Sequence, residues 1–187
     1  MIIGISGAAR SGKDLLFKLL SNNVNKSYNF TKLAFADELK MDLKNILKER
    51  FNIDVFNPSP EEKEIIRPLL VSYGTHLARK IDENYWIKKI DKKINSIKKD
   101  EKTLIFITDV RYPNEQNYIK TKFHKSLNIH LTRDGIGPAN EEELSNNELL
   151  KSNSDIKIKW SNYKDNIMEN DSIVDNLLKK IYHYNEE

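Results

Sequence analysis

The sequence predicts an α/β protein with a three-layer α/β/α arrangement, in which helices cover both faces of a mainly parallel sheet. Short apolar runs rich in β-branched residues alternate with stretches whose apolar residues recur at helical spacing. A glycine-containing segment joins the first apolar run to the first helical stretch. Strands separated by helices need crossover connections, and these connections favour parallel pairing with both faces of the sheet buried.

The predicted strands and helices alternate along the whole chain. Apolar runs predict strands at 1–6, 31–36, 103–108, 127–132 and 155–160. Helical spacing predicts helices at 13–22, 37–51, 68–81, 85–97, 114–123 and 172–184. The polar stretch at 135–147 contains two glycines and a proline, and we expect it to be a loop. These elements predict a single domain over residues 1–187.

The helix expected at 68–81 begins at a proline, which suits a first helical turn. Its predicted buried stripe consists of Leu69, Leu70, Tyr73, Leu77 and Ile81. Gly74 weakens this helix by ~1 kcal/mol relative to alanine, which indicates that a ligand or another backbone approaches closely. Thr75 and Arg79 lie one turn apart and face away from the stripe. Periodicity alone favours a surface ion pair between Arg79 and Asp82.

Composition narrows the class of protein. Charged residues make up 32% and hydrophobic residues 39% of the 187 residues, as in ordinary globular domains. The absence of cysteine excludes disulfides and thiolate chemistry. The four histidines lack metal-ligand spacing, so we expect them to be structural and to form no zinc site.

Charge and hydropathy limit the kinds of partner that the protein is expected to have. The apolar runs are far shorter than the ~20 residues that a membrane helix needs, and the N-terminus lacks a signal-peptide pattern. We therefore expect a cytoplasmic protein, in a bacterial or phage-infected cytosol, that has no membrane partner. The net charge of +3 is small, and the lysines are interleaved with acids. This pattern predicts small anionic ligands and no nucleic-acid partner.

The first glycine segment matches a phosphate-binding pattern, G-x-x-x-x-G-K-[ST], except at its last position. It reads Gly7, Ala8, Ala9, Arg10, Ser11, Gly12, Lys13, Asp14. Such a loop turns several backbone N–H groups toward one phosphate, the following helix adds its positive end, and the lysine reaches the β- and γ-phosphates. A chance glycine turn is the alternative. The strand before the segment and the helix after it favour binding of ATP.

The last position of the pattern normally supplies a hydroxyl ligand to Mg²⁺. Here Asp14 takes that position, and its carboxylate is a candidate ligand, either directly or through water. Ser11 is a second candidate for phosphate contact. Asp109 follows an apolar run, at a place where an acid in such folds holds the hydration shell of Mg²⁺.

Four stretches occur in an order that carries a family resemblance. They are Ser6-Gly7 to Lys13-Asp14; Phe35-Ala36-Asp37-Glu38-Leu39-Lys40; Arg67-Pro68-Leu69-Leu70 through Tyr73-Gly74-Thr75 and Arg79 to Tyr85-Trp86; and Asp109-Val110-Arg111-Tyr112-Pro113-Asn114-Glu115. This set resembles the deoxynucleoside monophosphate kinases of bacteriophages and their bacterial relatives, which are P-loop kinases. The Ser-Gly-Lys-Asp ending of the loop is usual in that family. The turn expected at 170–173, before the last helix, is also similar.

The resemblance implies a P-loop kinase fold with a helical acceptor-binding insert at about 37–100 and a lid-like loop at about 133–150. It implies an acceptor site that includes Phe35, Ala36, Asp37, Arg67, Gly74, Thr75, Arg79, Trp86 and Arg111. Arginine suits a phosphate because its fork binds two oxygens. The structural alternative for Asp37 is a helix N-cap. The structural alternative for Trp86 is a core residue. The family also allows a homodimer.

The arginines near the donor have separate alternatives. Arg111 is expected to contact the acceptor or the transferring phosphoryl group, and the alternative is an ion pair with Glu115. The lid-like loop has no arginine between residues 134 and 150. Arg133 and Arg10 are therefore the candidates for stacking on adenine or for stabilising charge on the phosphates.

The resulting hypothesis is a kinase that moves the γ-phosphate of ATP, with Mg²⁺, to a (deoxy)nucleoside monophosphate. Lys13, Asp37, Asp109 and Arg111 are its predicted catalytic residues. One alternative is a kinase of the same fold with another phosphorylated acceptor, such as phosphomevalonate, because animal phosphomevalonate kinases have a similar loop. Another is a non-catalytic ATP-binding sensor or interaction protein.

Overall fold

The computed structural model describes residues 1–187 except 26, 99, 139, 162–166 and 187. The chain divides into two compact units. One unit combines residues 1–33 with 99–187 and is called here the sheet unit. The other comprises residues 34–98 and is called the helical unit. Each unit is described by itself.

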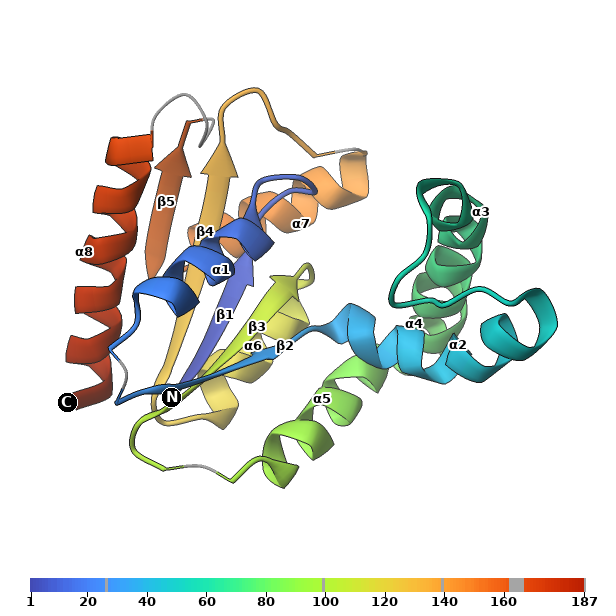
Figure 1. The fold of residues 1–187 in the computed structure, drawn as a ribbon, viewed down its shortest axis with the longest axis horizontal. Helices are drawn as coiled ribbons and strands as arrows, with labels where there is room; N and C mark the ends of the chain where they lie inside the picture. Colours follow the sequence, from blue (N-terminus) through green and yellow to red (C-terminus); the bar gives the residue numbers. More distant parts are fainter. Residues whose placement is uncertain (26, 99, 139, 162–166, 187) are drawn as a thin grey trace. The chain divides into compact units, whose positions relative to one another are not determined.

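The sheet unit contains a five-stranded sheet with the order β2-β3-β1-β4-β5 (Figure 1). Every adjacent pair of these strands is parallel. The strands are β1 (Ile2–Ser6), β2 (Asn29–Leu33), β3 (Thr103–Val110), β4 (Ser126–Arg133) and β5 (Ile156–Trp160). All five predicted strands are confirmed. The second one begins and ends earlier than predicted, so that residues 34–36 lie outside the sheet.

Helices cover both faces of this sheet, which confirms the predicted three-layer α/β fold (Figure 1). Helices α1 (Lys13–Asn23) and α8 (Ile167–Glu186) pack on one face, where Leu16, Leu20 and Val174 join the buried residues of the strands. Helices α6 (Pro113–Lys122) and α7 (Glu141–Ser152) lie on the other face. There the side chain of Ile119 reaches the backbone of Gly4 in β1.

Two predictions for the C-terminal part of the chain were wrong in their bounds. The loop expected at 135–147 ends at Asn140, because the side chain of Asn140 accepts a hydrogen bond from Glu143 N and caps α7. The acidic first turn, Glu141 to Glu143, suits the positive end of a helix. The turn expected at 170–173 lies inside α8, which begins at Ile167.

The helical unit consists of α2 (Phe35–Phe51), α3 (Pro60–Val71), the π-helix η1 (Ser72–Ala78), α4 (Arg79–Ile81) and α5 (Tyr85–Ser96). Its core contains Leu43, Leu47, Ile53, Val55 and Ile66. Helix α3 starts eight residues before the predicted Pro68. Ser59 and Glu62 form a capping box that fixes this earlier start, and Pro60 takes the first helical position.

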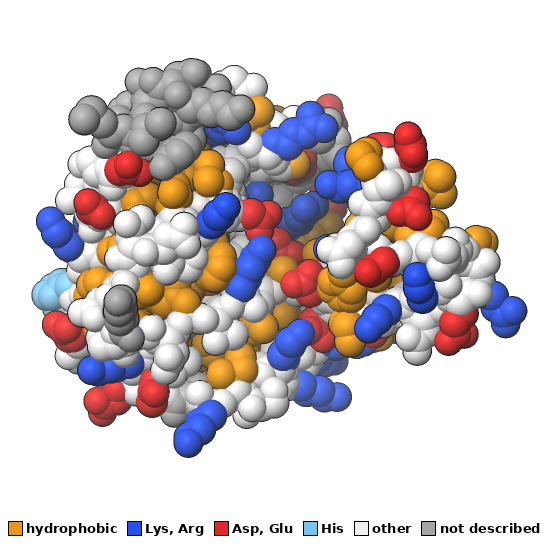
Figure 2. All heavy atoms as spheres, in the orientation of Figure 1, with side chains coloured by type: hydrophobic (Ala, Val, Ile, Leu, Met, Phe, Trp, Pro, Cys, Tyr) orange, Lys and Arg blue, Asp and Glu red, His pale blue; other side chains and the backbone are white. Residues whose placement is uncertain are grey.

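The predicted buried stripe of this helix is largely wrong. Leu69, Leu77 and Ile81 are exposed, and Figure 2 shows hydrophobic side chains at the surface of the helical unit. The buried positions are instead Ile66, Gly74 and Ala78. A π-helical turn takes up more residues than an α-helical turn. It therefore rotates the following residues away from the positions that a 3.6-residue period predicts.

None of the helices in the described part of the chain has the length and the apolar character that a membrane crossing requires.

Candidate active site

The loop between β1 and α1 can be formed only with glycine at two positions. Gly7 and Gly12 have φ angles of 140° and 96°, which side chains rarely adopt. A Cβ atom on Gly7 would lie 2.2 Å from the carbonyl oxygen of Leu131, and one on Gly12 would lie 2.7 Å from the ring of Trp160. The loop is thus pressed against the ends of β4 and β5, and its shape depends on both strands.

Trp160 packs against this loop and donates a hydrogen bond to it, a role that the sequence did not indicate. It is the last residue of β5 and is buried. Its indole Nε1 donates a hydrogen bond to the carbonyl oxygen of Ser11 over 3.0 Å. A tryptophan at the end of a predicted strand was the only available signal, and such a residue is normally read as core.

A buried polar pair lies directly before the loop, between β1 and β4. Ser6, the last residue of β1, has its Oγ 2.9 Å from Nδ1 of His130 in β4. Burial is the main reason that the pKa of His130 falls to about 4, and nearby lysines add to the effect. The ring is therefore neutral near physiological pH, as a structural histidine would be.

Lys13 is half-buried at the start of α1 and points back over the loop. Its Nζ donates hydrogen bonds to the carbonyl oxygens of Gly7, at 2.7 Å, and Ala8, at 2.9 Å. Burial lowers the pKa of Lys13 to about 8, and the positive charge of Arg111 lowers it further in the same direction. Asp109, Asp14 and Glu143 oppose this shift. Four charged side chains of the site, those of Arg111, Asp109, Asp14 and Glu143, therefore act on the charge of Lys13.

The predicted carboxylates lie in the sheet unit near Lys13, in different settings. Asp14 is 80% exposed and forms a 2.6 Å ion pair with Lys32 of β2. Asp109 is half-buried near the end of β3. Across the described ranges, no group of three or more His, Asp or Glu side chains could hold a metal ion.

Arg111 follows β3 and is exposed. The alternative for Arg111 was an ion pair with Glu115. The contacts of this carboxylate that shape the turn are with backbone groups. Glu115 is buried, and its Oε2 accepts hydrogen bonds from the backbone N–H groups of Arg111 and Tyr112. Glu115 thus shapes the turn that carries Arg111 out of the sheet.

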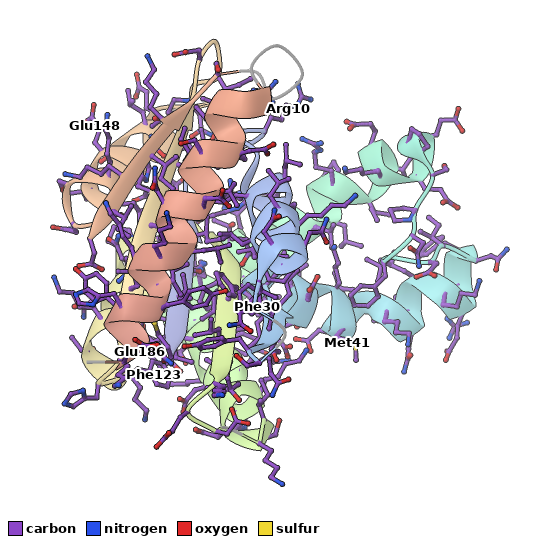
Figure 3. All side chains as sticks on the ribbon, turned by 60° about the vertical axis from the view of Figure 1, so that its left-hand side comes forward. Arg10, Phe30, Met41, Phe123, Glu148 and Glu186 are labelled. Carbon is purple, nitrogen blue, oxygen red and sulfur yellow. The ribbon has the colours of Figure 1, made fainter. Side chains whose placement is uncertain are left out.

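The two other candidate arginines also belong to the sheet unit. Arg10 lies in the loop with a left-handed φ of 65° and is exposed. Figure 3 shows Arg10 at the end of the sheet opposite to Phe123 and Glu186. Arg133 is the last residue of β4 and is half-buried. The carboxyl ends of the strands, where ligands bind in parallel sheets, therefore carry both residues.

A second contact on the loop was not predicted. The backbone N–H of Ala9 donates to Oε1 of Glu143 over 3.1 Å. Glu143 belongs to the first turn of α7, which the sequence had assigned to a loop. No sequence pattern links residues 9 and 143, so this contact is visible only in the tertiary structure.

The residues predicted for the acceptor belong to the helical unit, apart from Arg111. Asp37 is not the N-cap of its helix, because α2 begins at Phe35 with Ala34 as the cap. Asp37 lies instead in the first helical turn, 3.6 Å from Lys40. The cause is the earlier end of β2 at Leu33. Ala36, beside it, is half-buried.

The aromatic candidates of this unit are buried. Phe35 is 5% exposed and Trp86 is 3% exposed. The indole Nε1 of Trp86 donates to the carbonyl oxygen of Gly74 over 3.0 Å, and its ring packs edge-on against Tyr73 and Tyr85. These contacts make Trp86 a core residue of the helical unit.

Gly74 has a packing role. A Cβ atom there would lie 2.3 Å from Cδ1 of Leu39, so the close approach that the sequence indicated is made by a side chain of α2. Thr75, next to it in η1, is half-buried.

The two candidate arginines of this unit have neighbours within it. Arg67 does not precede a helix but lies inside α3, where it is exposed and 3.3 Å from Glu64. Arg79 donates through Nη1 to the carbonyl oxygen of Glu83. Asp82, its expected partner, forms a 2.6 Å ion pair with Lys88. Their contact with an acceptor phosphate stays a prediction.

A depression of about 780 Å³ in the sheet unit lies away from the loop. Its lining mixes both charges and consists of Met1, Tyr28, Asp100, Glu101, Lys102, Lys125, Asn185 and Glu186. None of the candidate site residues belongs to this lining, so its size does not bear on the phosphate loop.

Comparison with solved structures shows a similar fold. The chain is similar to the solved structure of dephospho-CoA kinase from Campylobacter jejuni, with 15% identity and a TM-score of 0.53, over 96% of this chain and 98% of that one. It also matches the crystal structure of TT1252 from Thermus thermophilus, with 13% identity and a TM-score of 0.49, over 98% and 96% of the two chains. No curated protein sequence matches significantly. The likeness to dephospho-CoA kinase shows the fold, a parallel sheet with helices on both faces.

The family follows from the sequence. The model of the phosphomevalonate kinase family matches residues 5–125, which is more than half of the chain. The chain belongs to the phosphomevalonate kinase family. The resemblance to deoxynucleoside monophosphate kinases is thus supported at the level of the P-loop kinases, and the matched family is a different one.

Proposed function

We propose that the protein transfers the γ-phosphoryl group of ATP to the phosphate of a small acceptor, with a (deoxy)nucleoside monophosphate as the first candidate. The observation that carries this proposal is the glycine loop between β1 and α1, over which Lys13 Nζ lies 2.7 Å from the carbonyl oxygen of Gly7. Arg111, Asp109 and Asp14 are the charged groups that act on Lys13 there. Phosphoryl transfer depends on positioning and on charge neutralisation, and this set offers both signs of charge. Membership of a kinase family supports the same reaction.

In the proposed reaction, an oxygen of the acceptor phosphate attacks the γ-phosphorus, and the bond to the β,γ-bridging oxygen breaks to release ADP. The acceptor is already an anion and needs no strong base. Lys13 and the N–H groups of the loop would bind the β- and γ-phosphates. Arg111, with Arg10 or Arg133, would neutralise charge on the transferring group. Asp37 would orient the acceptor.

Mg²⁺ fits the donor set around Lys13. Proteins commonly bind it through one or two carboxylates together with phosphate oxygens and water, and Asp14 and Asp109 would be those carboxylates. When bound, Mg²⁺ would supply further neutralisation of the phosphate charge. Asp14 would have to leave its ion pair with Lys32 to take this role.

Phosphomevalonate is the second candidate acceptor, and two observations favour it. The family match is to phosphomevalonate kinase. In addition, Phe35 and Trp86 are buried, which removes two aromatic faces on which a base could stack. An acceptor without a base does not need such faces.

A coupled assay of ADP release tests the proposal across the canonical nucleoside and deoxynucleoside monophosphates and phosphomevalonate. We expect turnover with an acceptor of one class, and its identity decides between the two candidates. The variant Lys13→Ala should lose transfer and keep its fold by circular dichroism. Lys18→Ala, an exposed lysine on the same helix, is the matched control.

Two outcomes would contradict the proposal. Full activity of Lys13→Ala would show that the loop does not carry the reaction. Binding of ATP without transfer to any acceptor would favour the non-catalytic sensor.

A further inference from the structure

The phosphate loop already holds an anionic group of the same chain. Its N–H groups are the donors that such loops offer to phosphate oxygens. One of them, Ala9 N–H, donates to Oε1 of Glu143 over 3.1 Å. A carboxylate oxygen can take the place of a phosphate oxygen on a loop N–H, because both are anionic hydrogen-bond acceptors.

The lysine of the loop is engaged in the same way. Lys13 Nζ donates to two carbonyl oxygens of the loop, those of Gly7 and Ala8. The negative charge of Glu143 also acts on the pKa of Lys13 and raises it. Glu143 therefore interacts with both kinds of group that a nucleotide phosphate would use, a backbone donor and the ammonium group.

Helix α7, which carries Glu143 in its first turn, is buried near its C-terminal end. Of the described residues of α7, Leu150 alone is buried. Its carbonyl oxygen accepts a hydrogen bond from Nε2 of Gln116 over 2.9 Å. Before α7, a Cβ atom on Gly135 or Gly137 would meet no atom within 4 Å, so both glycines border open space. A movement of the first turn of α7, Glu141 to Glu143, would therefore displace no buried side chain.

We propose that Glu143 is an internal ligand of the phosphate loop, which competes with the phosphates of the incoming nucleotide and thereby sets its affinity. This proposal rests on the proposed binding of ATP by the same loop. Nucleotide binding displaces the carboxylate from Ala9 N–H, and the first turn of α7 moves off the loop. A hydrogen bond to a charged group is stronger than a neutral one, so weakening it should tighten nucleotide binding about fivefold.

The test measures the dissociation constants of ATP and of inorganic tripolyphosphate by titration calorimetry near neutral pH. It compares the wild type with Glu143→Gln and with Glu142→Gln. Glu142 is the exposed neighbour in the same helical turn, so its variant removes the same charge without touching the loop. We expect Glu143→Gln to bind both ligands about fivefold more tightly than Glu142→Gln does. Tripolyphosphate isolates the competition for the phosphate site from contacts with the base.

A second readout follows the helix itself by hydrogen exchange. ATP should increase the exchange of amides in the first turn of α7 in the wild type, and in Glu143→Gln these amides should exchange faster before ATP is added. Equal affinities of the two variants, or weaker binding by Glu143→Gln, overturn the internal ligand and leave the proposed function standing. If none of the three proteins binds ATP, the proposed function fails and the internal ligand fails with it.

Discussion

The low pKa of Lys13 ties nucleotide binding to pH. The pKa of about 8 in the free protein lies below the ordinary 10.5, mainly because the group is buried. In the folded protein the charged form is therefore disfavoured, so this lysine lowers stability below pH 8, and that cost disappears as the pH rises from 8 to 10.5. Phosphates beside the ammonium group favour its charged form, so ATP should raise the pKa again.

We expect ATP binding to take up a proton through Lys13 in alkaline solution. The uptake should be about 0.1 proton per ATP at pH 7 and about 0.8–0.9 at pH 9 for a bound pKa of 10 or above. Calorimetry in buffers of different ionisation enthalpy measures it, and Lys18→Ala serves as the control. Uptake that does not grow between these pH values would contradict the assignment of Lys13.

Trp160 is expected to hold the loop in its binding shape. Trp160→Phe keeps an aromatic ring beside Gly12 and removes the N–H that donates to Ser11 O. Stability should fall by about 1–3 kcal/mol, because a buried carbonyl loses its partner, and ATP should bind more weakly. Urea unfolding and ATP titration measure the two effects.

The other tryptophan provides a matched control for this prediction. Trp86 also donates a 3.0 Å hydrogen bond to a buried carbonyl, that of Gly74, in the helical unit. Trp86→Phe should lose similar stability without a change in ATP affinity. A similar loss of ATP affinity in both variants would mean that Trp160 acts through general stability alone.

At the scale of elements, the helix that runs from Pro60 to Ile81 depends on its π-helical segment. Gly74 in η1 lets this helix approach Leu39 of α2, and Trp86 of α5 binds the Gly74 carbonyl. One small residue therefore joins three helices. From Ser72 onward the apolar period of 68–81 failed as a guide, because the π-turn changes which of the following residues face the core.

Gly74→Ala should cost the helical unit about 1–2 kcal/mol in packing, because its methyl group would displace the end of the half-buried Leu39 side chain. The gain in helix propensity, ~1 kcal/mol, offsets part of this cost. Chemical denaturation measures the free energy of unfolding. Gly137→Ala, where a Cβ would meet no atom within 4 Å, is the control and should change stability little.

Leu39→Ala provides the second half of the same test. In the Gly74→Ala background this truncation should cost less than in the wild type, because it relieves the overlap. Additive effects of the two substitutions would show that Gly74 and Leu39 do not pack as described.

At the scale of the whole molecule, the candidate residues separate into two groups. The loop, Asp109, Arg111 and Arg133 belong to the sheet unit, and the other acceptor-side residues belong to the helical unit. The helical insert expected at about 37–100 and the compact unit 34–98 have nearly the same bounds. Its binding of the acceptor remains a proposal, as does a homodimer, and the acceptor assay addresses the first of these.

The sequence by itself determined the α/β class, the five strands and the phosphate loop. These features follow from local patterns: the period of apolar residues and glycines at fixed spacing. The tertiary structure decided where β2 ends, where α3 and α7 begin, and how Gly74 and the loop are packed. Trp160 and Glu143 contact the loop across well over 100 residues of chain. Contacts of that range depend on the register of the strands and on how the helices pack on the sheet, and no local period encodes them.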